Sequence, residues 1–358
     1  MSPPNLHDHA TGRQFTELPD LAARSLGGSV VAANDELFAA KENLVRDAEP
    51  EHQPHTFGTK GQVYDGWETR RRREPGHDWA VIRLGASGVI RGVVVDTAYF
   101  RGNYPPECAV EACQVDGYPS PDELQKADWT MIVPRSATAG DTRNEFTVTV
   151  PGRFTHVRLS IHPDGGVARL RVHGVPVPDP RAFAGMPLDL AALVNGGGVV
   201  DASNRFYSRP DNLLMPGLAR VMGDGWETAR RRDGSNDWVV VRLAGRGEVR
   251  VVELDTTHFV GNAPGAAALR GLDGGPAELG DRLPGLDAPR AWADLLPLTR
   301  LQPDTPHRFV LPPGPPVTHV RLDIHPDGGL SRLRCFGTLT DEAWRLLLRR
   351  WQGELDPT

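Results

Sequence analysis

The sequence has few lysines and no excess of basic charge. Its 358 residues contain 40 basic and 46 acidic side chains, giving a net charge of −6, and the only lysines are Lys41, Lys60 and Lys126. A chain without a positive field has little to draw it to the phosphates of nucleic acid. We therefore expect no nucleic-acid partner, and we judge the arginine-rich stretches individually.

Long hydrophobic runs and paired cysteines are also missing. The chain has no run of about eighteen apolar residues, the length that spans a membrane. Residues 1–10 lack the charged-then-apolar layout of a signal peptide. The cysteines (Cys108, Cys113 and Cys335) are odd in number and form no CxxC motif. These absences argue against membrane insertion and secretion, and predict a protein of the reducing cytoplasm.

The chain contains an internal repeat. Residues 65–79 (DGWETRRRREPGHDW) return at an offset of 159 as residues 224–238 (DGWETARRRDGSNDW), and residues 156–166 return as 319–329. Two long copies of one motif set indicate two complete domains rather than a solenoid. We predict an N-terminal arm (1–28), a first repeat (29–178), a linker (179–188), a second repeat (189–338) and a C-terminal segment (339–358). Thr340 and the helical apolar spacing after it predict a short terminal helix.

Within each copy, apolar residues alternate with polar ones, as in residues 79–84 (WAVIRL) and 157–161 (VRLSI). Short alternating runs separated by glycine and proline predict an all-β chain of two tandem β-sandwiches. No GxGxxG opens a helix, which disfavours a dinucleotide-binding enzyme. We expect the ligand-binding residues on loops at one end of each sandwich, and Trp67, Trp79, Trp226 and Trp238 in the core.

The ordered motifs identify a family. Residues 66–70 (GWETR), 77–79 (HDW), 95–97 (VDT), 102–105 (GNYP) and 161–166 (IHPDGG) resemble those of allantoicase, also called allantoate amidinohydrolase, and the resemblance covers residues 20–338. It implies two tandem jelly-roll domains similar to galactose-binding and discoidin modules. It also implies a hydrolase of purine (allantoin) degradation that converts allantoate and water to ureidoglycolate and urea, and an oligomeric protein.

The release of intact urea requires cleavage of the bond between the α-carbon and a ureido nitrogen. This step needs an acid for the leaving urea, a base for water, and a group that binds the substrate carboxylate. His162 and His325 each end an alternating strand before Pro-Asp-Gly-Gly, where an imidazole is well placed for proton transfer; the alternative is that they cap the sandwich end. His77, Asp78 and Glu107 are further catalytic candidates. The first repeat keeps more titratable groups than the second and is therefore favoured as the active one, with a site shared between the repeats as the alternative.

A run of arginines follows the Trp-Glu pair of the first repeat. Because a guanidinium fork matches a carboxylate, one of Arg71, Arg72 and Arg73 is our candidate clamp. The same guanidiniums are expected to lower the pKa of Glu68, which would suit a base or an orienting partner. Asn103 and Asn262 offer amides that suit a ureido group, although turn formation explains them as well.

The sequence has no strong metal-binding spacing, such as HExxH or paired cysteines. We leave the cofactor undetermined and expect that none is required. The alternative function is a non-catalytic tandem jelly-roll module that binds a polar small ligand such as a sugar. The acidic, basic and imidazole side chains of the repeated motifs favour the enzyme.

Overall fold

The computed structural model describes residues 14–59, 61–274 and 292–354. The chain divides into two compact units between Val177 and Pro178. The predicted arm is described from residue 14 onward and belongs to unit 1, because Asp20 pairs with His173 of the last strand and Leu21 is fully buried. Residues 1–13 and the end of the C-terminal tail lie outside the described residues.

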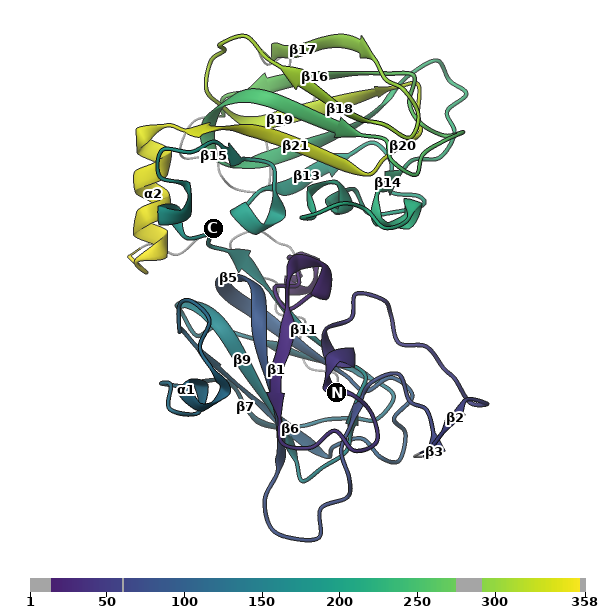
Figure 1. The fold of residues 1–358 in the computed structure, drawn as a ribbon, viewed down its shortest axis with the longest axis vertical. Helices are drawn as coiled ribbons and strands as arrows, with labels where there is room; N and C mark the ends of the chain where they lie inside the picture. The colour runs from purple at the N-terminus through teal and green to yellow at the C-terminus, as the bar shows by residue number, and fades with distance from the viewer. Residues whose placement is uncertain (1–13, 60, 275–291, 355–358) are drawn as a thin grey trace. The chain divides into compact units, whose positions relative to one another are not determined.

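Unit 1 is a β-sandwich with short helical turns (Figure 1). Its strands are β1 (Ser29–Ala33), β2 (Phe57–Gly58), β3 (Gly61–Gln62), β4 (Trp67–Glu68), β5 (Asp78–Asp96), β6 (Glu107–Cys113), β7 (Thr130–Ala137), β8 (Arg143–Thr147), β9 (Arg153–His162), β10 (Gly166–Val167) and β11 (Arg169–Pro176). Its helices are η1 (Phe15–Glu17), η2 (Arg24–Leu26), η3 (Lys41–Val45) and α1 (Pro121–Gln125).

The long strand β5 takes part in both layers of the sandwich. Its first half pairs with β1 and with β9, and the order continues through β6 to β7. Its second half pairs with β11 and β8. Gly88 lies between the two halves, where a Cβ would clash with the Val175 carbonyl. This arrangement places Asp78, the first residue of β5, beside the end of β9 at His162.

Unit 2 repeats this plan. Its strands are β12 (Leu188–Asp189), β13 (Gly198–Ala202), β14 (Trp226–Glu227), β15 (Asp237–Asp255), β16 (Ala266–Leu272), β17 (Ala293–Arg300), β18 (Pro306–Val310), β19 (Val317–His325), β20 (Gly329–Leu330) and β21 (Arg332–Leu339). Its helices are η4 (Pro180–Phe183), η5 (Leu193–Asn195), η6 (Pro210–Leu214), η7 (Met222–Asp224) and α2 (Asp341–Trp351). The fold is therefore the predicted pair of tandem jelly-roll sandwiches.

The C-terminal helix α2 begins as the sequence predicts. The Thr340 side chain caps it by accepting a hydrogen bond from the Ala343 amide. Asp341 and Glu342 lie in the first turn and Arg349 and Arg350 in the last, each complementing the helix dipole. No helix in the described part of the chain is long and apolar enough to cross a membrane.

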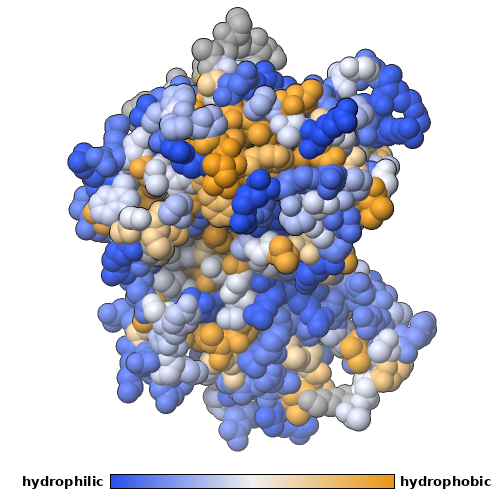
Figure 2. Space-filling model, turned by 45° about the horizontal axis from the view of Figure 1, so that its top comes forward, coloured by the Kyte–Doolittle hydropathy of each residue, from blue (hydrophilic) through white to orange (hydrophobic). Residues whose placement is uncertain are grey.

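Two of the four tryptophans lie in the core, as expected, and two do not. Trp67 and Trp226 are fully buried, and their indole N–H groups donate to the carbonyls of Asp35 and Asn204. Trp79 and Trp238 are only half-buried, which corrects the sequence-based interpretation. Each is the second residue of a long strand, on the face opposite to the buried aspartate before it, and packs there at the edge of a small hydrophobic cluster that contains Val81 in unit 1 and Val240 in unit 2. Most of the face drawn in Figure 2 is hydrophilic, with hydrophobic side chains gathered in patches.

The charged side chain of Arg169 is part of the unit 1 core. Arg169 is 1% exposed, and its guanidinium donates to the carbonyls of Ala48 and Asp65 and to the Asp65 carboxylate. Buried charges are tolerated when they are paired and hydrogen-bonded in this way. Arg169 thereby fixes the long segment between β1 and β4 to the last strand.

Candidate functional site

Three loops of unit 1 meet at the end of the sandwich around residues 163–166. The Pro163 carbonyl accepts from the Asp78 amide at 3.1 Å, and the Gly165 carbonyl accepts from the Thr69 amide at 3.1 Å. The Gly166 amide donates to the Asn103 carbonyl at 2.7 Å. These backbone bonds join the segments that carry most of the predicted site residues.

Two predicted imidazoles lie against each other there. The ring centroids of His77 and His162 are 4.7 Å apart. His77 is exposed at the loop before β5, and His162 is half-buried at the end of β9. Burial lowers the pKa of His162, and the positive charges of Arg135 and His77 lower it further. A histidine of this kind is neutral at neutral pH and can accept a proton.

Glu107 lies beside His162, opposite it in the β6–β9 register. Its carboxylate accepts from the Arg135 Nε at 2.9 Å, so the negative charge is partly balanced. Glu107 still acts to raise the pKa of His162, against the larger opposite effects. The structure thus brings together three of the predicted catalytic residues.

The predicted catalytic Asp78 is buried and joined to the predicted clamp. Its Oδ1 accepts from Arg72 Nη1 at 2.7 Å and from Asn34 Nδ2 at 2.9 Å. The backbone amide of Arg72 donates to Asp164 at 2.8 Å. Asp78 therefore holds the Arg72 guanidinium in place, and Asp164 holds the loop from which it projects.

The other two arginines of the run are arranged differently. Arg71 and Arg73 are exposed, and neither has a hydrogen-bond or ion-pair partner among the described residues. Arg72, by contrast, lines a surface groove of about 630 Å³ together with Asn34, Gly76, His77, Trp79, Glu111 and Arg158. Of the three candidates, the geometry favours Arg72.

The prediction of a lowered pKa for Glu68 is wrong. Burial raises the pKa of Glu68, and the hydrogen bond from Asn103 Nδ2 at 2.7 Å offsets this only in part. The neighbouring guanidiniums are engaged elsewhere, since Arg70 binds Asp35 and Arg72 binds Asp78. In unit 2, Glu227 accepts from Asn262 at the same distance of 2.7 Å.

Unit 2 keeps the scaffold of this site but changes its polar groups. Arg231 binds Asp237 at 2.8 Å, as Arg72 binds Asp78. His325 ends β19 as His162 ends β9. Asn236, however, takes the place of His77, and Ala266 is opposite His325 in the strand register where Glu107 is opposite His162. At these two positions of the described chain, His325 therefore has neither an imidazole nor a carboxylate like those beside His162.

Sequence reasoning missed two charged residues of the groove. Arg158 of β9 binds Glu111 of β6, with Nε 2.8 Å from the carboxylate, and their side chains are 26% and 22% exposed. Arg158 and Glu111 each occupy an outward position of an alternating strand. Charged residues without any function occupy such positions as well, so the pattern alone does not indicate a site. The recurrence of Arg158 as Arg321 in the second copy was the available signal.

No group of three or more histidine, cysteine, aspartate or glutamate side chains in the described ranges is arranged to hold a metal ion. The described site therefore offers imidazoles, guanidiniums and carboxylates as its chemical groups. The expectation that no cofactor is required stays a prediction.

Comparison with known proteins identifies the family. The family profile "Allantoicase repeat" matches residues 19–177 and 188–340. A probable allantoicase of Nocardia farcinica is 55% identical over 93% of this chain and 98% of its own length, and one of Rhizobium meliloti is 43% identical over 90% and 94%. The crystal structure of allantoicase from Saccharomyces cerevisiae is 34% identical, with a TM-score of 0.75 over 90% of this chain and 93% of that one. The chain belongs to the allantoicase family.

Proposed function

We propose that the chain hydrolyses allantoate to ureidoglycolate and urea, and that the reaction takes place in the groove of unit 1. The observation that supports this site is the meeting of His77, His162 and Arg72 at one end of the sandwich. The tandem binding module considered above requires no such pair of imidazoles, and membership in the allantoicase family favours the enzyme.

The chemistry defines what the groove must supply. The α-carbon of allantoate carries a carboxylate and two ureido groups. Protonation of one ureido nitrogen lets urea depart, while the lone pair of the other ureido nitrogen forms the double bond that replaces the broken one. Water then adds to the α-carbon and loses a proton to a base, giving ureidoglycolate. Each positioned acid or base contributes about 10²–10⁴-fold to the rate.

His162 is the proposed base. Since burial lowers its pKa, it is neutral near pH 7 and can take the proton from water. His77, exposed on the groove and in ring contact with His162, is the proposed acid for the leaving urea. Passage of the proton from His162 to His77 would restore both groups after a turnover.

Arg72 and Arg158 are the proposed partners of the substrate carboxylate, because both guanidiniums line the groove. Asp78 acts as a positioning residue for Arg72, and Glu107 tunes the charge around His162. We propose that the Glu68–Asn103 and Glu227–Asn262 pairs brace their loops, since both repeats keep them at the same distance.

A urea-release assay with allantoate tests the function, and His77→Asn tests the site. This variant places in unit 1 the residue that unit 2 already carries as Asn236, so the backbone is expected to tolerate it. We expect turnover to fall about 100-fold with unchanged thermal stability. No urea from folded wild-type protein would refute the function. Full activity of His77→Asn would refute the site alone.

The setting of the enzyme is also a proposal. We infer a reducing cytoplasm, because Cys108, Cys113 and Cys335 are all free and buried. We propose a homo-oligomer, no nucleic-acid partner and no required cofactor. Sedimentation of the purified protein would measure the number of chains in the assembly.

A further inference from the structure

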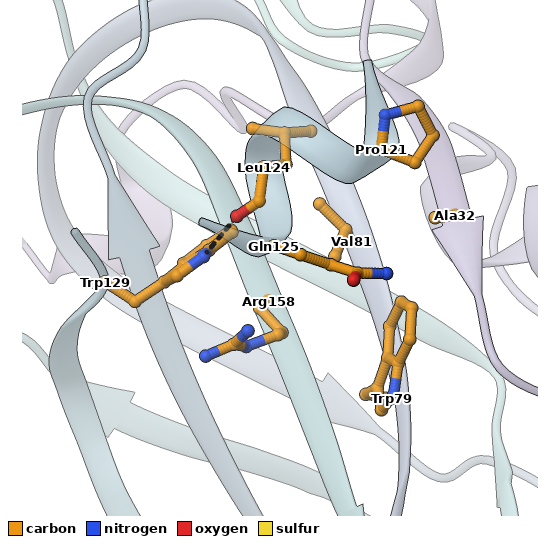
Figure 3. Close-up of a pocket in the computed structure, with 8 residues that line it drawn as sticks. All are labelled: Ala32, Trp79, Val81, Pro121, Leu124, Gln125, Trp129 and Arg158. Atoms are coloured by element: carbon orange, nitrogen blue, oxygen red, sulfur yellow. Dashed lines mark hydrogen bonds between the residues drawn. The ribbon is translucent and has the colours of Figure 1, made fainter. Parts of the chain in front are cut away.

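A second pocket adjoins the groove of unit 1. It encloses about 380 Å³ and is lined by Ala32, Trp79, Val81, Pro121, Leu124, Gln125, Trp129 and Arg158. Figure 3 shows Trp79 and Trp129 on opposite sides, with Arg158 between them. Trp79 and Arg158 also line the groove, so the two cavities share a wall.

The walls of this pocket are held rigidly. Ser120 and Glu123 form a capping box at the start of α1, which places Leu124 over the sheet. The indole N–H of Trp129 donates to the Leu124 carbonyl at 2.8 Å, as the dashed line in Figure 3 shows. The Arg158 guanidinium lies over the Trp129 ring, 4.6 Å from its centroid. The pocket therefore needs no rearrangement of these groups to accept a ligand.

The lining is mostly apolar and aromatic, with one cation. This combination is typical of small-molecule sites, in which a few polar groups orient an apolar ligand. Arg158 binds Glu111 through Nε and Nη2, and its Nη1 has no hydrogen-bond partner in the described part of the chain. We propose that the pocket binds a planar aromatic carboxylate, whose ring packs against Trp79 and Leu124 of the lining and whose carboxylate meets Arg158.

Unit 2 shows a related contact on the other tryptophan. Arg321, the counterpart of Arg158, lies over the ring of Trp238, the counterpart of Trp79, at 4.6 Å. It donates to the Asp323 carboxylate from Nε at 3.0 Å. The position of Asp323 is occupied by Ser160 in unit 1, and Arg270 replaces Glu111. Each stacked guanidinium therefore pairs with one carboxylate of the chain, which comes from the neighbouring strand β6 in unit 1 and from the same strand β19 in unit 2. In unit 1, Nη1 of Arg158 remains for a ligand carboxylate.

The proposed ligand differs from allantoate. Allantoate has no apolar ring, and transfer of its ureido groups against Leu124 and Val81 would leave their hydrogen bonds unmade. A bound aromatic carboxylate would nevertheless engage Arg158, which the groove also uses. We therefore expect the bound aromatic carboxylate to raise the KM for allantoate. This expected rise in KM rests on the proposed function. Binding of the aromatic carboxylate does not, because it is measured without turnover.

Calorimetry with 2-naphthoate tests the pocket. We expect saturable binding of one molecule per chain, at least tenfold weaker binding of neutral 2-naphthamide, and no binding to Gln125→Trp, which fills the cavity. Thr130→Trp is the matched control, because residue 130 is exposed on the next strand and does not line the pocket. It should bind 2-naphthoate as the wild type does. No saturable binding to wild type, or equal binding to Gln125→Trp, would overturn the proposal.

A second variant tests the role of Arg158. Ser160→Asp keeps Glu111 on Arg158 and adds the carboxylate that unit 2 carries as Asp323. With this second carboxylate beside Arg158, 2-naphthoate binding should weaken at least tenfold while the thermal transition stays cooperative. Unchanged affinity in this folded variant would contradict the assignment of Arg158. If the wild type binds 2-naphthoate but its KM for allantoate does not rise, the pocket does not influence substrate binding in the groove.

Discussion

The ring of His77 lies 4.7 Å from that of His162, centroid to centroid, with 41° between the two planes. At this distance a proton on one ring disfavours a proton on the other. A charge on His77 therefore lowers the pKa of His162, which favours His162 as the proton acceptor of the pair.

Removal of the proposed base should separate the two repeats. His162→Ala is expected to lower kcat about 100-fold, because water loses its proton acceptor. His325→Ala should change kcat less than twofold, since Asn236 provides no partner imidazole in unit 2. Steady-state kinetics of the two variants, with thermal melts as the folding control, measures this difference. Equal small losses in both would contradict a site in unit 1.

The pH profile should report the charges around His162. The base acts when neutral, so kcat/KM should fall as pH decreases through a pKa below the ordinary 6.5. Arg135→Gln removes a positive neighbour and should move this limb to higher pH, whereas Glu107→Gln removes a negative one and should move it to lower pH. Shifts in the same direction for both variants would refute the assignment of the limb to His162.

Arg72→Lys keeps the charge of the proposed clamp but loses its planar fork. We expect the KM for allantoate to rise about tenfold with a smaller change in kcat, as for a group that binds substrate and transition state alike. Arg231→Lys is the matched control, because Arg231 binds the equivalent carboxylate, that of Asp237, although through Nε rather than Nη1. A normal KM for Arg72→Lys would remove Arg72 from the binding site.

The asparagine–glutamate pairs should behave alike in the two repeats. Asn103→Ala and Asn262→Ala each leave a half-buried glutamate without its donor, which should lower the free energy of unfolding by about 1–3 kcal/mol. Denaturant titration measures the loss. If Asn103→Ala abolishes turnover and leaves stability intact, Asn103 binds substrate and the bracing role is wrong.

Treatment with a chelator should leave the enzyme active. The departing urea needs a proton, and the second ureido nitrogen supplies the electrons, so acid and base side chains suffice for the proposed route. Protein verified as metal-free by elemental analysis should retain most of its kcat. Loss of activity that manganese or zinc restores would contradict this prediction and would make His77, Asp78 and His162 candidate ligands.

The repeat and the alternating strands allowed the fold to be predicted, because both can be read from the spacing of residues along the sequence. The offset of 159 aligns Trp67 with Trp226, and the two occupy the same core position. Spacing also placed His162 at a strand end. Alternation could not show which outward residues are covered, and for this reason Trp79 was assigned to the core and Arg158 was missed.

The electrostatics of the site were harder to predict than its location. Four consecutive arginines near Glu68 indicated a lowered pKa for Glu68. The charge of a guanidinium, however, affects a pKa only within a few ångströms, and the conformation of the turn decides where each arginine side chain points. Arg70 and Arg72 point to Asp35 and Asp78, so burial dominates at Glu68 and raises its pKa. Adjacency in sequence did not determine which charges meet.

The buried guanidinium of Arg169 has a consequence for motion. By binding Ala48 and Asp65 it joins the segment between β1 and β4 to a core strand, and that segment leads into the Trp67–Glu68 motif. Opening this segment at Ala48 or Asp65 would take the partners from a buried guanidinium, so these two anchor points should open mainly together with the whole unit. Arg169 thus anchors the chain that leads into the Trp67–Glu68 motif, so that the start of this motif keeps its place relative to β11.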